Sequence, residues 1–248
     1  MTVPEILALA VAGIIAGGLN AIVGSGSFVA FPALLALGYS PVVANVTNRV
    51  GLVLGLFSGV AGYRRELVGQ RDRAVRLGIP TLLGAMLGAF LLLILPPIIF
   101  QRVAPVLIVL AVGLMLAGSR LSKALEKHAE AWWAKPMLPV SVFLTATYGG
   151  YFGAAMGVIM ISVLNVMLED SLVRLNGLKT LLTGSISAVA AILFIFFGHV
   201  AWPAAIILAA SSIAGGWIGA SVGRRLSTTA LKWIVVIGGV VAVIKLVT

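Results

Sequence analysis

The chain has 248 residues, of which 61% are hydrophobic and only 10% are charged. Its mean hydropathy is +1.16, whereas a soluble domain carries roughly 25% charged residues, so the composition excludes a soluble protein and predicts an integral membrane protein. The net charge of +10 is explained by basic loops beside a membrane, and we expect no nucleic-acid partner. Because the chain has no cysteine, disulfides, thiolate metal sites and cysteine nucleophiles are excluded.

Long uncharged runs follow one another along the chain, and several exceed the roughly 20 residues that cross a bilayer as a helix. They cover residues 6–48, 77–101, 136–168 and 180–223. The alternating pattern of a membrane barrel is absent, so the spans are predicted to be helices. The fold class is therefore an all-α polytopic membrane protein with about eight spans.

The first run contains a break. After an apolar helix, "GSGSF" at residues 24–28 interrupts the pattern, and a short apolar segment of about 11 residues follows, too short to cross a bilayer alone. We predict a broken helical hairpin that enters and leaves on one side. A helix then begins at Pro41, with Ser40 in the N-cap position. It carries Asn45, Asn48 and Arg49 on one face through spacings of three and four residues.

Two further spans, residues 77–95 and 103–118, follow a basic loop. Basic residues also cluster after the second of these spans and near residue 224. By the positive-inside rule these segments are predicted to be cytoplasmic, in a multi-pass membrane protein with both termini outside. The basic residues concerned are Arg64, Arg65, Arg71, Arg73, Arg76, Arg120, Lys123, Lys127, Lys135, Arg224 and Arg225.

The second half repeats the pattern of the first. "GAAMG" at residues 153–157 corresponds to the first break, and Ser171 precedes a helix as Ser40 does. Charge placement makes the helix from Leu172 run opposite to the helix from Pro41. We therefore predict two inverted-topology repeats, residues 1–118 and 136–248, joined by a cytoplasmic linker at 119–135. Each repeat is a broken hairpin followed by three long helices, which is a pattern of transporters.

Polar residues from the two repeats are expected to meet. Asn48 and Lys179 each follow their cap by about eight residues, about 12 Å into a core about 30 Å thick, so both are predicted near the midplane. All seven acids lie in loops or at helix ends, so a buried cation there lacks a counter-charge, and we predict an anionic substrate. The candidate substrate-binding residues are Asn45, Asn48, Arg49, Asn176, Lys179 and Thr180. The candidate backbone residues at the breaks are Asn20, Gly24, Ser25, Gly26, Ser27, Gly153 and Gly157.

Other roles for these residues stay open. Arg49 can instead donate hydrogen bonds to backbone carbonyls of a broken segment, and Lys179 can be purely structural. The glycines at the breaks can simply permit close helix packing. Arg174, beside Glu169 and Asp170, is interpreted as an interfacial residue.

The quoted segments, with "GGLNAIVGSGSFVAFPALLALGYSPVVANVTN" and "NGLKTLLTG", resemble the TauE/SafE family, also called the toluene sulfonate uptake permease family. The resemblance covers essentially the whole chain. It implies a bacterial inner-membrane carrier of sulfite, sulfoacetate or other organosulfonates. The family's small-residue motif falls on residues 24–27, its first polar element on Asn45, Thr47 and Asn48, and its second on Asn176 and Lys179. Arg49 departs from the family pattern.

The sequence thus predicts a secondary transporter that works by alternating access, with no cofactor or resident metal. The alternatives are an anion channel, or a carrier of another small anion such as a carboxylate. An enzyme is not expected, because acid, base and metal motifs are missing. A coupled proton or sodium ion, and a monomer or homodimer, stay open as partners besides the bilayer and the anion.

Overall fold

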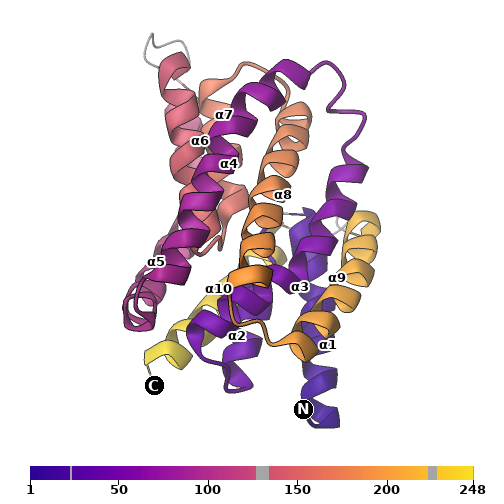
Figure 1. Ribbon diagram of the computed structural model, residues 1–248. Helices are drawn as coiled ribbons and strands as arrows, with labels where there is room; N and C mark the ends of the chain where they lie inside the picture. Colours follow the sequence, from indigo (N-terminus) through magenta and orange to yellow (C-terminus); the bar gives the residue numbers. More distant parts are fainter. Residues whose placement is uncertain (23, 127–133, 223–227, 248) are drawn as a thin grey trace.

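The computed structural model describes residues 1–22, 24–126, 134–222 and 228–247, which form ten helices and no strand (Figure 1). The all-α prediction is confirmed. The first five helices are α1 (Val3–Ile22), α2 (Ser27–Ala36), α3 (Pro41–Gly62), α4 (Arg71–Ile94) and α5 (Pro97–Glu126). The second five are α6 (Ala134–Tyr151), α7 (Met156–Met167), α8 (Leu172–Phe197), α9 (Trp202–Val222) and α10 (Thr228–Val247).

Both predicted breaks are present. The chain turns between α1 and α2 and again between α6 and α7, where Gly24 and Gly153 have φ angles of 76° and 78°. Glycine adopts this left-handed conformation without the steric cost that a side chain brings. Helices α2 and α7 have 10 and 12 residues, fewer than the roughly 20 that cross a bilayer. By contrast, α1, α4, α8 and the first part of α5 are long and apolar enough to cross it.

Helix ends agree with the expected signals in part. Ser171 accepts a hydrogen bond from the Arg174 N–H at 3.4 Å and so caps α8, and Pro41 occupies the first position of α3, where a missing N–H costs nothing. Helix α5 continues to Glu126, into the predicted linker at 119–135. The segment "SRLSKALE" favours helix through its leucine, alanine, lysine and glutamate residues. Residues 127–133 and 223–227 lie outside the described residues.

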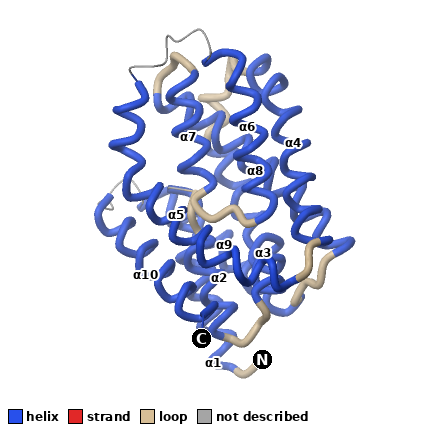
Figure 2. Tube along the Cα trace, turned by 90° about the vertical axis from the view of Figure 1, so that its left-hand side faces the viewer, coloured by secondary structure: helices blue, strands red, loops and turns tan. Residues whose placement is uncertain are grey.

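The helices form two bundles, which we call lobe one (α1, α2, α3, α9 and α10) and lobe two (α4 to α8). Figures 1 and 2 show lobe one toward one end of the molecule, with both termini, and most of lobe two toward the other. In lobe one, α9 packs along α1 and α3; in lobe two, α4 packs along α6 and α8. The chain passes from one lobe to the other at residues 63–70 and again at 198–201. Helix α3 of lobe one packs on helix α8 of lobe two.

The packing within lobe one recurs in lobe two when each helix is replaced by the one five places along the chain. For example, α1 against α9 becomes α6 against α4, and α2 against α10 becomes α7 against α5. The most extensive contact in each lobe, α1 on α9 and α4 on α6, needs a glycine. A Cβ on Gly17 of α1 would collide with Ser212 O of α9, and a Cβ on Gly88 of α4 would collide with Thr147 O of α6. Small residues let membrane helices approach this closely.

Helices α3 and α8 run antiparallel. The Ala201 N–H, just after α8, donates to Thr47 Oγ1 near the start of α3 at 3.0 Å. At the other end, Gln70 Nε2 donates to Arg174 O near the start of α8 at 2.9 Å. The prediction that these two helices have opposite directions is confirmed.

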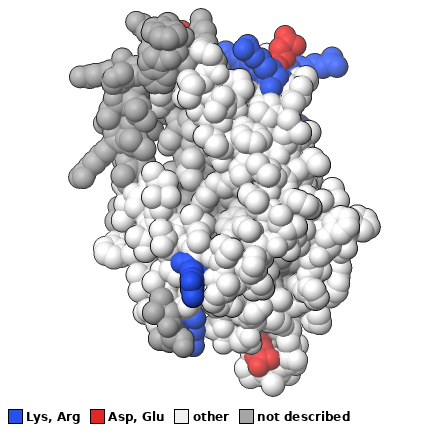
Figure 3. Space-filling model, turned by 60° about the vertical axis from the view of Figure 1, so that its left-hand side comes forward, with Lys and Arg blue, Asp and Glu red and all other residues white. Residues whose placement is uncertain are grey.

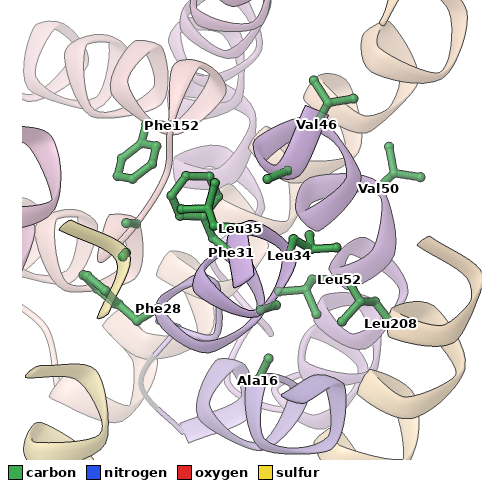
Figure 4. Close-up of a cluster of buried hydrophobic side chains, with 14 of the residues drawn as sticks. Ala16, Phe28, Phe31, Leu34, Leu35, Val46, Val50, Leu52, Phe152 and Leu208 are labelled. Carbon is green, nitrogen blue, oxygen red and sulfur yellow. The ribbon is translucent and has the colours of Figure 1, made fainter. Parts of the chain in front are cut away.

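Short helix α2 is enclosed by protein. Its side chains Phe28, Phe31 and Leu34 are buried and lie among side chains of neighbouring helices, including Ala16 and Phe152 (Figure 4). Large apolar side chains are exposed on several helices. On the face drawn in Figure 3, Lys and Arg form one group at the upper end and another toward the lower end, with an uncharged band between them. An apolar band of this kind is what a bilayer requires.

Candidate functional site

Both breaks line one small cavity between the lobes. Its volume is about 20 Å³, enough for about one water molecule. The lining residues are Asn20, Gly24 and Ser27 from the first hairpin, Asn48, Arg49, Leu52 and Leu56 from α3, Gly153 and Met156 from the second hairpin, and Thr183 and Ser187 from α8. The two breaks also touch directly, because a Cβ on Gly24 would lie 3.3 Å from Gly157 Cα.

Arg49 crosses from α3 to the second break. Its Nη2 donates to Phe152 O at 3.0 Å and to Gly149 O, and its Nη1 donates to Ser187 Oγ at 3.2 Å. A Cβ on Gly153 would collide with the guanidinium, so residue 153 is glycine for two reasons, its positive φ and this contact. The bonding to carbonyls of a broken segment, one of the two roles considered for Arg49, is therefore present.

The charge of Arg49 is not balanced by a carboxylate. Arg49 is 5% exposed, and the ion pairs found among the described residues both belong to Asp170. The acceptors of Arg49 are neutral, and two are carbonyls at the C-terminal end of α6, where the helix dipole is negative. Bonds to described residues use three of the five guanidinium donors. Within the described part of the chain, a buried cation with two further donors therefore lies beside the cavity.

Asparagines attach the same face of α3 to both breaks. Asn45 Nδ2 donates to Tyr151 O at 2.9 Å, and Asn48 Nδ2 donates to Ser27 Oγ at 3.1 Å. Within the first break, the Gly26 N–H donates to Asn20 Oδ1 at 2.7 Å. Ser25 Oγ and Asn48 Oδ1 are buried with no partner among the described residues. Of the first-half candidates, Asn20, Gly24, Ser27, Asn48 and Arg49 therefore line the cavity, whereas Asn45, Ser25 and Gly26 do not.

The second-half candidates lie elsewhere on α8. Asn176 Nδ2 donates to Leu172 O at 3.0 Å, and Thr180 Oγ1 donates to Asn176 O at 2.7 Å. Lys179 is buried, at 6% exposed, but does not line the cavity. Thr183 and Ser187, about 6 and 12 Å further along α8, occupy the positions expected for Lys179 and its neighbours. Helix α8 has 26 residues, about 39 Å, so its midpoint lies beyond residue 179.

Sequence reasoning missed three residues at this site. Thr183 and Ser187 continue the series 179, 183, 187 on one face of α8, so the four-residue spacing was an available signal. Tyr148 donates from its hydroxyl to Ala154 O at 2.6 Å and so fixes the second break. No periodic pattern marks that bond, because it spans a turn that is not helical.

Just before the start of α8, away from the cavity, Asp170 forms ion pairs with two arginines. Its carboxylate lies 2.5 Å from Arg73 Nη1 and 3.1 Å from Arg174 Nε, and the Arg174 side chain is 38% exposed, as expected for an interfacial residue. Burial raises the pKa of the Asp170 carboxyl, but hydrogen bonds from the Ser171 N–H and the two guanidinium groups lower it by more. The pKa therefore lies below its usual value. In the described part of the chain, no group of three or more His, Asp or Glu side chains could hold a metal ion.

Broken helices that meet at a polar cavity inside an apolar helical protein define a class, the membrane transporters. The family model "Sulfite exporter TauE/SafE" matches residues 9–246, and the chain belongs to this family of membrane transporters.

Relatives support the same class. The chain is 30% identical over 227 residues to a probable membrane transporter protein of Haemophilus influenzae, covering 91% of this chain and 88% of that one. It is 26% identical over 214 residues to the probable membrane transporter protein YfcA of Escherichia coli K12, covering 86% and 77%. The probable membrane transporter protein ORF9 of a Sinorhizobium species is 23% identical over 241 residues, covering 96% and 90%. No solved structure matches the chain.

Proposed function

We propose that the protein is a secondary transporter of small sulfur-containing oxyanions, such as sulfite, sulfoacetate or other organosulfonates, across the bacterial inner membrane by alternating access. The observation that carries the proposal is Arg49, a buried guanidinium beside a cavity lined by both breaks, with no carboxylate partner among the described residues. The oxyanion supplies the missing negative charge. Sulfite is the anion in the family's own description.

Hydrogen-bond donors around the cavity suit an oxyanion. Arg49 retains two donors, and the hydroxyls of Ser27 and Ser187 face the same space from opposite lobes. Charge-assisted bonds from guanidinium to oxyanion oxygens are about twice as strong as neutral ones. Asn45 and Asn48 hold the two breaks in position for these contacts.

Lys179, Asn176 and Thr180 have a separate part in the proposal. They lie nearer the start of α8 than the cavity does. In this proposal Lys179 attracts the anion electrostatically toward Arg49. Asn176 and Thr180 offer hydrogen bonds to the anion as it passes along α8 to the cavity. This assignment rests on the burial of an ammonium for which the described residues provide no ion pair.

Alternating access follows from the two lobes. The recurrence of one packing pattern in both lobes supports two inverted repeats, residues 1–118 and 136–248. Each lobe combines three helices of one repeat with the last two helices of the other, and in the proposed mechanism the two lobes rock against each other. Because the cavity holds about one water, it must widen before an anion enters, and we expect α3 and α8 to separate at one end. The basic segments face the cytoplasm and both termini face outside in this proposal.

Proteoliposomes test the proposal. Labelled sulfite, sulfoacetate and a dicarboxylate are offered to the reconstituted protein, and initial rates are measured against concentration. The proposal predicts saturable flux of the sulfur oxyanions and weaker flux of the carboxylate. Rates that rise linearly with concentration would indicate a channel, and saturable flux of the carboxylate alone would contradict the substrate class.

A further inference from the structure

Two buried oxygen atoms lack partners at one crossing between the lobes. Glu66 Oε2 and Gln70 Oε1 are both enclosed, and neither has a hydrogen-bond partner among the described residues. They belong to one turn, because Gln70 Nε2 donates to Glu66 O at 2.9 Å. Gln70 is only 1% exposed. Buried polar atoms are nearly always paired, and the exceptions often mark a bound ion or water.

The orphan atom of Gln70 is an acceptor. Gln70 Nε2 donates to two backbone carbonyls, Glu66 O and Arg174 O, each at 2.9 Å. Exchanging the amide nitrogen and oxygen would turn an oxygen toward two other oxygens, so the orientation is fixed by its neighbours. The carboxylate of Glu66 is also an acceptor when ionised. Both atoms therefore lack a donor or a cation.

Nearby cations do not compensate Glu66. Arg73 and Arg174 are both bound to Asp170, and Arg174 also donates to Val68 O at 3.2 Å. The elements that meet here also carry other charged residues, which are Arg64 and Arg65 on the turn, both exposed, Arg71, Asp72, Arg73 and Arg76 on α4, and Asp170, Arg174 and Lys179 just before or on α8. None of them forms a described ion pair with Glu66.

Glu66 is packed tightly on α8. A Cβ on Gly177 would lie 3.1 Å from Glu66 Cβ, so the backbone of α8 meets the glutamate without a side chain between them. This contact joins the turn after α3 to the first turns of α8. An enclosed carboxylate oxygen without a donor is costly, and the cost disappears when the charge is neutralised.

We infer that Glu66 and Gln70 form a site for a sodium ion, with Glu66 Oε2 and Gln70 Oε1 among its ligand atoms. The inference rests on the proposed transport function and assigns its coupling ion. A sodium ion that takes both oxygens as ligands satisfies both orphan atoms at once.

The position of the site links cation binding to lobe movement. Residues 63–70 carry the chain from lobe one to lobe two and continue α3, which holds Arg49 and Asn48 in the cavity. With the cation bound, the turn stays packed on α8. Without it, the carboxylate needs water, which favours separation of α3 from α8. Cation and anion then change each other's affinity by the same factor.

The test compares anion exchange with gradient-driven uptake in proteoliposomes. Exchange of labelled for unlabelled anion moves no net cation, whereas uptake is measured with a proton gradient and a sodium gradient imposed separately. The variant Glu66→Gln keeps the shape and removes the charge. Glu169→Gln, an exposed acid between α7 and α8, is the matched control. Glu66→Asp keeps the charge on a shorter side chain and serves if Glu66→Gln does not fold.

We expect wild type and Glu169→Gln to respond to the sodium gradient, and a response to the proton gradient alone would overturn the assignment of the ion. Sodium should tighten anion affinity in wild type by about 5- to 150-fold, the usual size of coupling between sites. In Glu66→Gln sodium should no longer tighten anion affinity, and Glu66→Asp should need more sodium for the same effect. Retained gradient response in Glu66→Gln overturns the inference, as does a wild type that exchanges but responds to neither gradient, since the site then holds water. Absence of exchange in wild type contradicts the proposed function instead.

Discussion

Arg49 Nη2 donates to Phe152 O at 3.0 Å, and this bond joins α3 of lobe one to the broken segment of lobe two. The ring of Phe152 in turn packs edge-to-face on Phe31 of α2, with centroids 5.7 Å apart. One cation therefore holds both breaks together at the cavity. In the proposed mechanism the anion binds the remaining donors of Arg49, beside these bonds, so anion binding and lobe separation involve the same side chain.

Replacing Gly153 by alanine should destabilise the protein. The added Cβ collides with the Arg49 guanidinium, and the φ angle of 78° costs a residue with a side chain about 1 to 3 kcal/mol. Thermal unfolding of the detergent-purified protein measures the change. Gly78→Ala in α4 is the control, because no atom lies within 4 Å of its new Cβ. Equal melting temperatures for the two variants would show that the contact with Arg49 is unimportant.

Replacing Ser187 by alanine should weaken anion transport without preventing folding. Arg49 Nη1 then loses its acceptor. Because hydrogen bonds to charged groups contribute about 1.5 to 3 kcal/mol, we expect KM for the anion to rise by about tenfold or more. Ser185→Ala on the same helix is the control, since its hydroxyl donates only to Leu181 O. Identical kinetics in both variants would exclude Ser187 from the site.

Much of this site follows from sequence because chain breaks leave a clear signal. Gly24 to Ser27 and Gly153 to Gly157 interrupt apolar runs, and the helices after them are too short to cross a bilayer. The acceptors of Arg49 do not follow, because backbone carbonyls carry no sequence signature. The position of Lys179 was also misplaced, since Ser171 fixes where α8 begins but not where its midpoint lies. The packing of α1 on α9 was equally hidden, because a glycine such as Gly17 fits many partners.

Replacing Lys179 by alanine tests its proposed attraction of the anion. Removing a buried cation from the approach should raise KM and reduce flux by about tenfold, within the range for charge pairs. Salt should change the difference between wild type and variant little, because buried charges are screened much less than exposed ones. Lys245→Ala, near the end of α10, is the control. Unchanged flux in Lys179→Ala would remove this residue from the mechanism.

Replacing Asp170 by asparagine should make stability depend less on pH. The folded-state pKa of Asp170 lies below its usual value, so its ion pairs stabilise the protein above the unfolded pKa of about 3.9. That contribution is lost as pH falls through the lower folded-state pKa. We expect Asp170→Asn to melt earlier than wild type at pH 7 and to approach it as the pH falls below the unfolded pKa of about 3.9. The exposed Asp72→Asn is the control, and a constant difference at all pH values would contradict the expectation.

The role of Arg49 is the central claim, and the half-saturating anion concentration for exchange tests it most directly. It is measured in proteoliposomes for wild type, Arg49→Lys, Arg49→Gln and the exposed control Arg102→Lys, with melting temperatures beside it. We predict that Arg49→Gln raises this concentration by at least about 30-fold, from the 2 to 5 kcal/mol of a lost buried charge contact. The half-saturating concentration of Arg49→Lys should lie between those of wild type and Arg49→Gln, because lysine keeps the charge but lacks the planar fork of donors. A folded Arg49→Gln with wild-type half-saturation would contradict the account and leave Arg49 a structural residue.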